Sequence, residues 1–209
     1  MKKLLLILIA LPMIGFGQNV NIPDANFKAY LVGEPTINTN GDTEIQVSEA
    51  NAFPGNIVCY NMNIADLTGI EEFTALNYLN CGGNQLSSLD VSGATALTVL
   101  QCYSNQLTSL DVSQNTALVE LSCGGNQLTI LDVSANTALI QLVCSDNPLT
   151  SLDVSNNTAW LDILICVNNQ LTSLDVSNNL VLMTLNCSGN SLTSLDISYN
   201  TDLENLDCY

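Results

Sequence analysis

The chain has 209 residues and carries 20 Asp and Glu against 3 basic residues, so its formal net charge at pH 7 is −17. The basic residues are Lys2, Lys3 and Lys28, and the sequence contains neither Arg nor His. Affinity for phosphate groups rests on Lys and Arg, so nucleic acid is excluded as a partner, and an anionic membrane surface would repel the chain. Without His, no set of base, nucleophile and orienting residue can be named, and we expect no enzyme.

Residues 1–17 are typical of a secretory signal sequence. Two lysines precede an apolar run that begins at Leu4, and two glycines follow that run. This order matches the n-region, h-region and cleavage site of such a signal, and we predict cleavage before Gln18. The alternative, an uncleaved membrane anchor, is disfavoured because the run is short and contains Pro12. We therefore expect a secreted, extracellular or cell-surface protein without membrane insertion after cleavage.

Residues 18–53 do not share the pattern of the rest of the chain and are predicted to form a small N-terminal cap. Asp24 can open a helix that ends by Gly33 and Pro35. A second, short helix is predicted from Ser48 to Phe53. The apolar face of the first helix, at spacings of three and four, consists of Phe27, Tyr30 and Leu31.

The loop between these helices resembles a degenerate calcium-binding loop of the EF-hand type. When residues 38–49 are aligned to a twelve-residue loop, positions one, three, five and twelve are Asn38, Asn40, Asp42 and Glu49. Two positions depart from the pattern, because position one is Asn rather than Asp and position six is Thr43 rather than Gly. Two interpretations stay open: a weak Ca²⁺ site, or a turn-rich loop without a cofactor.

From residue 54 to residue 209 the chain repeats one unit, represented by residues 97–117. The steps between successive cysteines are 21 or 22 residues. A fixed period in this range predicts a solenoid, in which each unit buries its apolar face only against its neighbours. The eight cysteines that set the register are Cys59, Cys81, Cys102, Cys123, Cys144, Cys166, Cys187 and Cys208.

The unit reads L-x-x-L-x-C-x-x-N-x-L-T-S-L-D-V-S-x-N-T-A, which resembles the leucine-rich repeat with Cys in its third aliphatic position. Its second half resembles the short bacterial 21-residue class. The resemblance implies a superhelical solenoid with one short parallel strand per repeat. The first turn departs from the motif with Met62, whereas six turns carry the motif Asn: Asn84, Asn105, Asn126, Asn147, Asn169 and Asn190.

The N-terminal segment of the cap carries a second resemblance. The segment I-P-D-A-N-F-K-A-Y-L is similar to N-terminal segments of secreted repeat proteins from Bacteroidetes-type bacteria. Such proteins often end in a sorting domain for type IX secretion, and none is visible here. The sequence stops within a repeat, at Cys208 and Tyr209, which leads us to consider it a possible fragment of a longer protein.

The cysteines are predicted to be buried and reduced. Leu100 and Cys102 are two residues apart on one short strand, so both side chains face the core. Parallel strands in register stack equivalent side chains about 4.8 Å apart, whereas the Cβ atoms of a disulfide lie about 3.8 Å apart. We therefore interpret these cysteines as small core residues rather than as disulfides or metal ligands.

Outward-facing positions of the strands are the candidates for binding. Most of them are small and polar, but one group is apolar where solvent is expected, and two tyrosines lie further along the same face. The alternative interpretation is that these residues only fill a strand. Trp160 lies at a one-residue insertion and could face inward or outward. The candidate ligand-binding residues are Val143, Ile163, Ile165, Val167, Tyr103 and Tyr78.

A second column consists of acidic side chains about 5 Å apart, which repel one another by roughly 0.8 kcal/mol per pair at the dielectric constant of water. Three arrangements could offset this repulsion: hydrogen bonds from the backbone of each D-V-S-x-N turn, a wider outer face, or bound cations. The first is favoured, because Asp commonly accepts N–H groups in its own turn. The column consists of Asp90, Asp111, Asp132, Asp153, Asp175 and Asp196.

Taken together, these patterns favour a binding or adhesion module that recognises a protein or glycan through the strand face. Two alternatives stay open: a structural stalk that only spaces other domains, and a calcium-dependent surface protein. A binding module needs irregular residues on its strand face, and this chain has them in one region. A structural stalk needs none.

Overall fold

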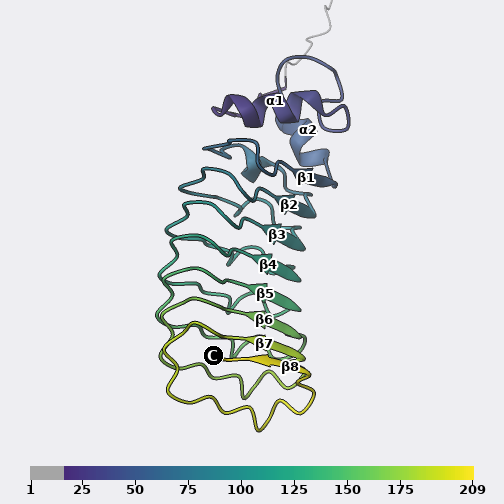
Figure 1. Ribbon diagram of the computed structural model, residues 1–209. Helices are drawn as coiled ribbons and strands as arrows, with labels where there is room; N and C mark the ends of the chain where they lie inside the picture. Colours follow the sequence, from purple (N-terminus) through teal and green to yellow (C-terminus); the bar gives the residue numbers. More distant parts are fainter. Residues whose placement is uncertain (1–16) are drawn as a thin grey trace, which may run out of the picture.

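A computed structural model describes residues 17–209 (Figure 1). The predicted signal sequence, apart from Gly17, lies outside the described residues. Eight short strands form one parallel sheet in which each strand pairs with the strands next to it in the sequence. This is the predicted solenoid with one strand per repeat. The strands are β1 (Asn56–Val58), β2 (Tyr78–Asn80), β3 (Val99–Gln101), β4 (Glu120–Ser122), β5 (Gln141–Val143), β6 (Ile163–Ile165), β7 (Thr184–Asn186) and β8 (Asn205–Asp207).

The strands stack in register, so that equivalent residues of successive turns lie side by side. Leu79 is paired with Leu100, and Leu100 with Leu121. From β2 to β7 the central Leu of each strand is buried and its two neighbours are half-buried. Burial of one such side chain stabilises the fold by about 1.5–3 kcal/mol, and each turn gains this only against its neighbours.

Cysteines form a column in the core beside these leucines. Seven of the eight are buried, as predicted, and none of the eight is bridged in the described structure. Cys208 is the exception and is exposed, because it follows β8, the last strand of the stack. The prediction of burial is therefore wrong for Cys208.

The motif asparagines form a ladder through the interior. In the central turn, Asn126 Nδ2 donates to the carbonyl oxygens of Cys102 (3.1 Å) and Cys123 (2.9 Å). Its Oδ1 accepts from the N–H of Leu107 at 3.0 Å. Each amide thus joins two successive turns. The residue that precedes it has a positive φ, as at Gly125 (63°), which favours Gly, Asn or Asp there.

A second asparagine ladder was not predicted. Asn136 Nδ2 donates to the carbonyl oxygens of Val112 (3.0 Å) and Asn115 (2.9 Å), both in the preceding turn. Its Oδ1 is buried and accepts no hydrogen bond from a described residue. The recurring N-T-A of the repeat was the available signal. Equivalent fully buried amides are Asn115, Asn157 and Asn179, with Asn200 almost as buried.

Two helices, α1 (Ala25–Gly33) and α2 (Val47–Ala52), lie at the β1 end of the stack (Figure 1). Asp24 Oδ1 caps α1 by accepting from the N–H groups of Asn26 (2.9 Å) and Phe27 (3.0 Å). The hydroxyl of Tyr30 accepts from the N–H of Val58 at 2.9 Å. The cap thus pairs a backbone N–H of the edge strand β1. A short 3₁₀ helix, η1 (Ile70–Glu72), follows β1. Within residues 17–209, no helix has the length and apolar character needed to cross a bilayer.

Candidate binding surface

The predicted apolar residues of the strand face come together on β5 and β6. Val143 and Ile165 are paired across the two strands, and Ile163 lies two residues before Ile165. Val167 follows just beyond β6, and all four side chains are half-buried. We call Val143, Ile163, Ile165 and Val167 the strand-face cluster. The structure places these residues side by side; whether they bind a partner stays a prediction.

The other end of the strand face is a polar network. The hydroxyl of Tyr78 and Nδ2 of Asn80 each donate to Oε1 of Gln101 at 2.9 Å. Gln101 Nε2 in turn donates to Oε1 of Glu120 at 2.8 Å. These contacts fix the side chains across β2, β3 and β4. Tyr78 is therefore part of a hydrogen-bonded surface rather than a free aromatic group.

Tyr103 has an aromatic partner that the sequence analysis missed. Its ring centroid lies 6.1 Å from that of Tyr60, with the ring planes tilted by 43°. The two residues are two turns apart, and Gly82 stands between them in the intervening turn. A Cβ atom at Gly82 would lie 2.7 Å from the Tyr103 ring, so the rings meet because Gly has no side chain. The available signal was the position of Tyr60, which follows a column cysteine as Tyr103 does.

Trp160 faces outward, since 62% of its surface is exposed. The structure thereby decides between the two orientations left open by the sequence. The inserted residue enlarges the loop that leads into β6, and the indole does not enter the core.

The aspartate column is held as predicted. Each Asp accepts the N–H of the Ser two residues later through Oδ1, at 2.8 or 2.9 Å. The Ser134 hydroxyl and N–H lower the pKa of Asp132, and the Ser113 N–H and hydroxyl lower the pKa of Asp111. The pKa values of Asp90, Asp153, Asp175 and Asp196 shift in the same direction.

Acid should therefore destabilise the solenoid. A carboxyl whose pKa is lower in the folded state contributes stability above its unfolded pKa of about 3.9, and this is lost as the pH falls through the folded value. We expect the melting temperature to fall below about pH 4, and Asp132→Asn, which keeps an acceptor but does not titrate, to weaken that fall. A melting temperature that climbs from pH 7 to pH 4 would show that repulsion along the column dominates instead.

The predicted calcium loop is closed by its own hydrogen bonds. Glu49 Oε1 accepts from the N–H groups of Thr39 (2.8 Å) and Asn40 (3.1 Å), and its Oε2 accepts from the N–H of Gln46 (3.0 Å). Burial alone would raise the pKa of Glu49, but these N–H groups and the Thr39 hydroxyl hold it below its usual value. Asn38 Oδ1 accepts from the N–H of Gly41 at 3.0 Å.

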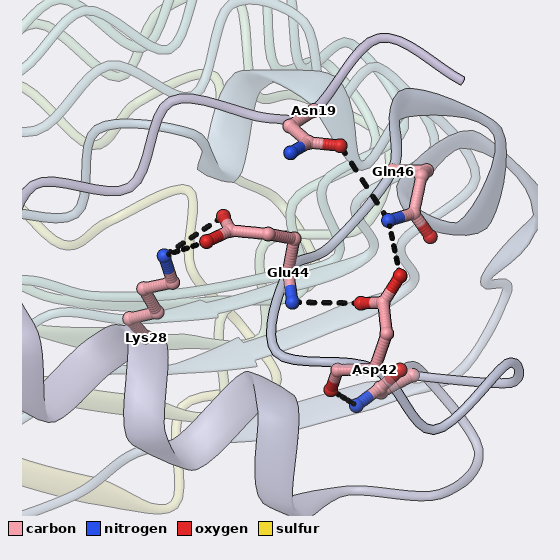
Figure 2. Close-up of polar contacts among 6 residues, drawn as sticks. Asn19, Lys28, Asp42, Glu44 and Gln46 are labelled. Atoms are coloured by element: carbon pink, nitrogen blue, oxygen red, sulfur yellow. Dashed lines mark hydrogen bonds and ion pairs between the residues drawn. The ribbon is translucent and has the colours of Figure 1, made fainter. Parts of the chain in front are cut away.

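Figure 2 shows further polar contacts of the same loop. Asp42 accepts from the N–H of Glu44 (2.7 Å) and from Nε2 of Gln46 (3.1 Å), and Lys28 forms an ion pair with Glu44 at 2.7 Å. Asn40 Oδ1 accepts from the N–H of Asp42 at 2.8 Å, so each of the four predicted ligand residues accepts a hydrogen bond from the loop itself. No group of three or more His, Cys, Asp or Glu in residues 17–209 is arranged to hold a metal. Calcium binding at Asn38, Asn40, Asp42 and Glu49 stays a prediction.

Comparison with known proteins places this fold among leucine-rich-repeat solenoids. The functional domain of InlJ from Listeria monocytogenes, described as including a cysteine ladder, is 37% identical over 92% of this chain and 47% of that one, with a TM-score of 0.69. A leucine-rich-repeat protein from Leptospira interrogans is 25% identical over 78% of this chain and 45% of that one, with a TM-score of 0.70. The chain therefore spans about half the length of these two structures.

A third structure shows the fold alone. It is the leucine-rich-repeat ectodomain of the plant membrane receptor kinase GASSHO1/SCHENGEN3 from Arabidopsis thaliana, in complex with CASPARIAN STRIP INTEGRITY FACTOR 2. It is 23% identical over 74% of this chain and 20% of that one, with a TM-score of 0.63. No protein-family model and no curated protein matches the sequence.

Proposed function

We propose that this chain is a secreted or cell-surface binding module that recognises a protein or glycan through its strand face, without enzymatic activity. The observation that carries the proposal is the strand-face cluster, which places four aliphatic side chains on a face that is otherwise mainly polar. The fold supports it, because solenoids present extended surfaces suited to binding. The predicted signal sequence supports the location.

The arrangement of the face suits a modest interface. Complete burial of a fully exposed aliphatic side chain contributes about 1.5–3 kcal/mol. The four side chains are already half-buried, so each offers part of this gain, and together they can anchor a complex. The network of Tyr78, Asn80 and Gln101 offers ordered polar groups further along the same face. The Tyr60–Tyr103 pair adds an aromatic surface that a sugar ring or an apolar side chain can contact.

The double variant Ile165→Asp with Val143→Ser is expected to abolish partner binding and leave the fold intact. The two positions are paired on adjacent strands, and a charge between them would have to lose its water on binding. The measurement is a pull-down from the native cell surface, with a glycan array in parallel and a thermal melt of each variant.

A matched control is Ser122→Asp, which adds the same charge one strand away, at the position paired with Val143. Binding should survive in this control. Unchanged binding by the double variant would discard the strand-face cluster and favour the stalk alternative. Binding that disappears on chelation, and also when Asn38 and Glu49 are replaced, would favour a calcium-dependent surface protein.

A further inference from the structure

A second group of exposed apolar side chains lies on the loops that lead into β5, β6 and β7. After the buried Asn115, Asn136 and Asn157 the next two residues are Thr and Ala, whereas after Asn179 they are Leu180 and Val181. The five residues are 38–62% exposed. We call them the loop-edge patch: Ile140, Trp160, Leu180, Val181 and Met183.

One carboxylate lies within this patch. The N–H of Asp162 donates to the carbonyl oxygen of Ile140, and the N–H of Met183 donates to that of Asp162, both at 2.9 Å. Asp162 therefore stands between two apolar residues in one column of the stack. Its Oδ1 atom is buried from solvent and accepts no hydrogen bond from residues 17–209.

A buried carboxylate oxygen without a partner is unfavourable, and the strongest partners for it are Lys and Arg side chains. Lys28 is the only basic side chain in residues 17–209, and it forms an ion pair with Glu44 in the N-terminal cap. Residues 17–209 of a second copy carry the same single cation, already paired with Glu44, and the same excess of acidic residues. The complementary charge therefore has to come from a different molecule.

We propose that the loop-edge patch docks a segment of a partner protein that places a Lys or Arg side chain on Asp162 and apolar side chains on the residues around it. This inference rests on the proposed binding function and names its partner class as protein. Aliphatic side chains around a carboxylate match an apolar segment with one cation better than they match a hydroxyl-rich glycan. The patch adjoins the strand-face cluster, because Ile163 directly follows Asp162.

The probe is a phage-displayed library of random twelve-residue peptides, selected on the wild-type chain at physiological ionic strength. We expect the recovered peptides to carry Lys or Arg flanked by apolar residues. Asp162→Asn should weaken their binding about 30-fold or more, because the removed charge would be desolvated and paired in the complex. Replacing the Arg of a synthetic selected peptide by citrulline should weaken binding to the wild-type chain to a similar degree.

The matched control is Glu204→Gln, which removes a charge from the same column one turn beyond Met183, outside the patch. Peptide affinity should be unchanged there, since a general attraction of basic peptides to an acidic chain would respond equally to both substitutions. Asp162→Asn should also melt no lower than the wild type, because Asp162 Oδ1 accepts no hydrogen bond from residues 17–209 that the substitution would break.

Recovered peptides without enrichment in Lys or Arg, or equal binding to wild type and Asp162→Asn, would overturn the inference. So would a failure to recover any peptide. These results would not decide the proposed function, which is tested separately by the cell-surface pull-down with Ile165→Asp and Val143→Ser. Loss of binding in that pull-down together with full binding by Asp162→Asn would uphold the strand face and reject the loop-edge patch.

Discussion

Thermal stability is expected to collapse between about pH 9 and pH 10, because the column cysteines are buried as neutral thiols. Burial raises the pKa of Cys59 and of Cys166 to about 12. Burial also raises the pKa values of Cys81, Cys102, Cys123 and Cys144 well above their ordinary value. A thiol whose pKa is higher in the folded state contributes its full stability below the unfolded pKa of about 8.5, and this is lost as the pH rises toward the folded value.

The expected effect is large because the thiols act together. Above the unfolded pKa, each buried thiol lowers the free energy of unfolding by about 1.4 kcal/mol per pH unit. Six of them would remove a typical folding free energy of about 5–15 kcal/mol within roughly two pH units. The measurement is the melting temperature by circular dichroism from pH 7 to pH 10, with a reductant present so that disulfides do not form.

A matched variant separates the thiols from Tyr30, whose pKa is also raised by burial. Cys102→Ala with Cys123→Ala should lower stability at pH 7, because two cavities are created in the core. The same variant should lose stability less steeply above pH 9, since two titrating groups are absent. A melting temperature that stays level up to pH 10 would show that the thiols do not resist ionisation in the folded state.

Much of the fold could be predicted from the sequence because the decisive interactions repeat locally. The spacing of Leu100 and Cys102 by two residues places both side chains on the same face of a strand. The period of 21 or 22 residues then determines which residues are stacked. The first helix was likewise readable from Asp24, which caps it, and from the spacing of Phe27 and Leu31.

Features that depend on the particular side chains of neighbouring turns could not be predicted from the repeat. The Tyr60–Tyr103 pair requires the missing side chain of Gly82 between two turns. The environment of Asp162 depends on Ile140 and Met183, which are more than 20 residues away in the sequence. The backbone contacts of Asp162 recur in successive turns, but the side chains at this position differ from turn to turn. Irregular side chains of this kind form the candidate binding surfaces.

The two asparagine ladders look alike in the sequence, yet their removal is expected to have different consequences. In the first ladder, Asn126→Ala removes the partner of the Leu107 N–H, whose hydrogen bond in the structure goes to Asn126 Oδ1. It also removes donors to Cys102 and Cys123, although these carbonyls keep the amides of Asn105 and Asn147. An orphaned buried N–H costs about 1–3 kcal/mol and each lost bond about 1, so the free energy of unfolding should fall by roughly 3–5 kcal/mol.

In the second ladder, Asn136→Ala orphans no described group. The carbonyl oxygens that Asn136 contacts keep backbone donors, because the N–H of Asn115 donates to Val112 and the N–H of Leu118 donates to Asn115, both at 3.0 Å. The substitution also removes the buried Oδ1 that accepts no hydrogen bond. The chain itself carries Ala94 at the equivalent position of an earlier turn, where it is fully buried.

We therefore expect Asn136→Ala to lower the free energy of unfolding by about 1–2 kcal/mol, clearly less than Asn126→Ala. Urea unfolding of the two variants and the wild type measures the difference, and a shared m-value would show that the same structure unfolds in each. Equal losses would mean that the cavity left by the amide, which is of similar size at both positions, outweighs the orphaned N–H of Leu107. A larger loss for Asn136→Ala would mean that its Oδ1 is stabilised in the folded protein, and that the second ladder holds the turns together as firmly as the first.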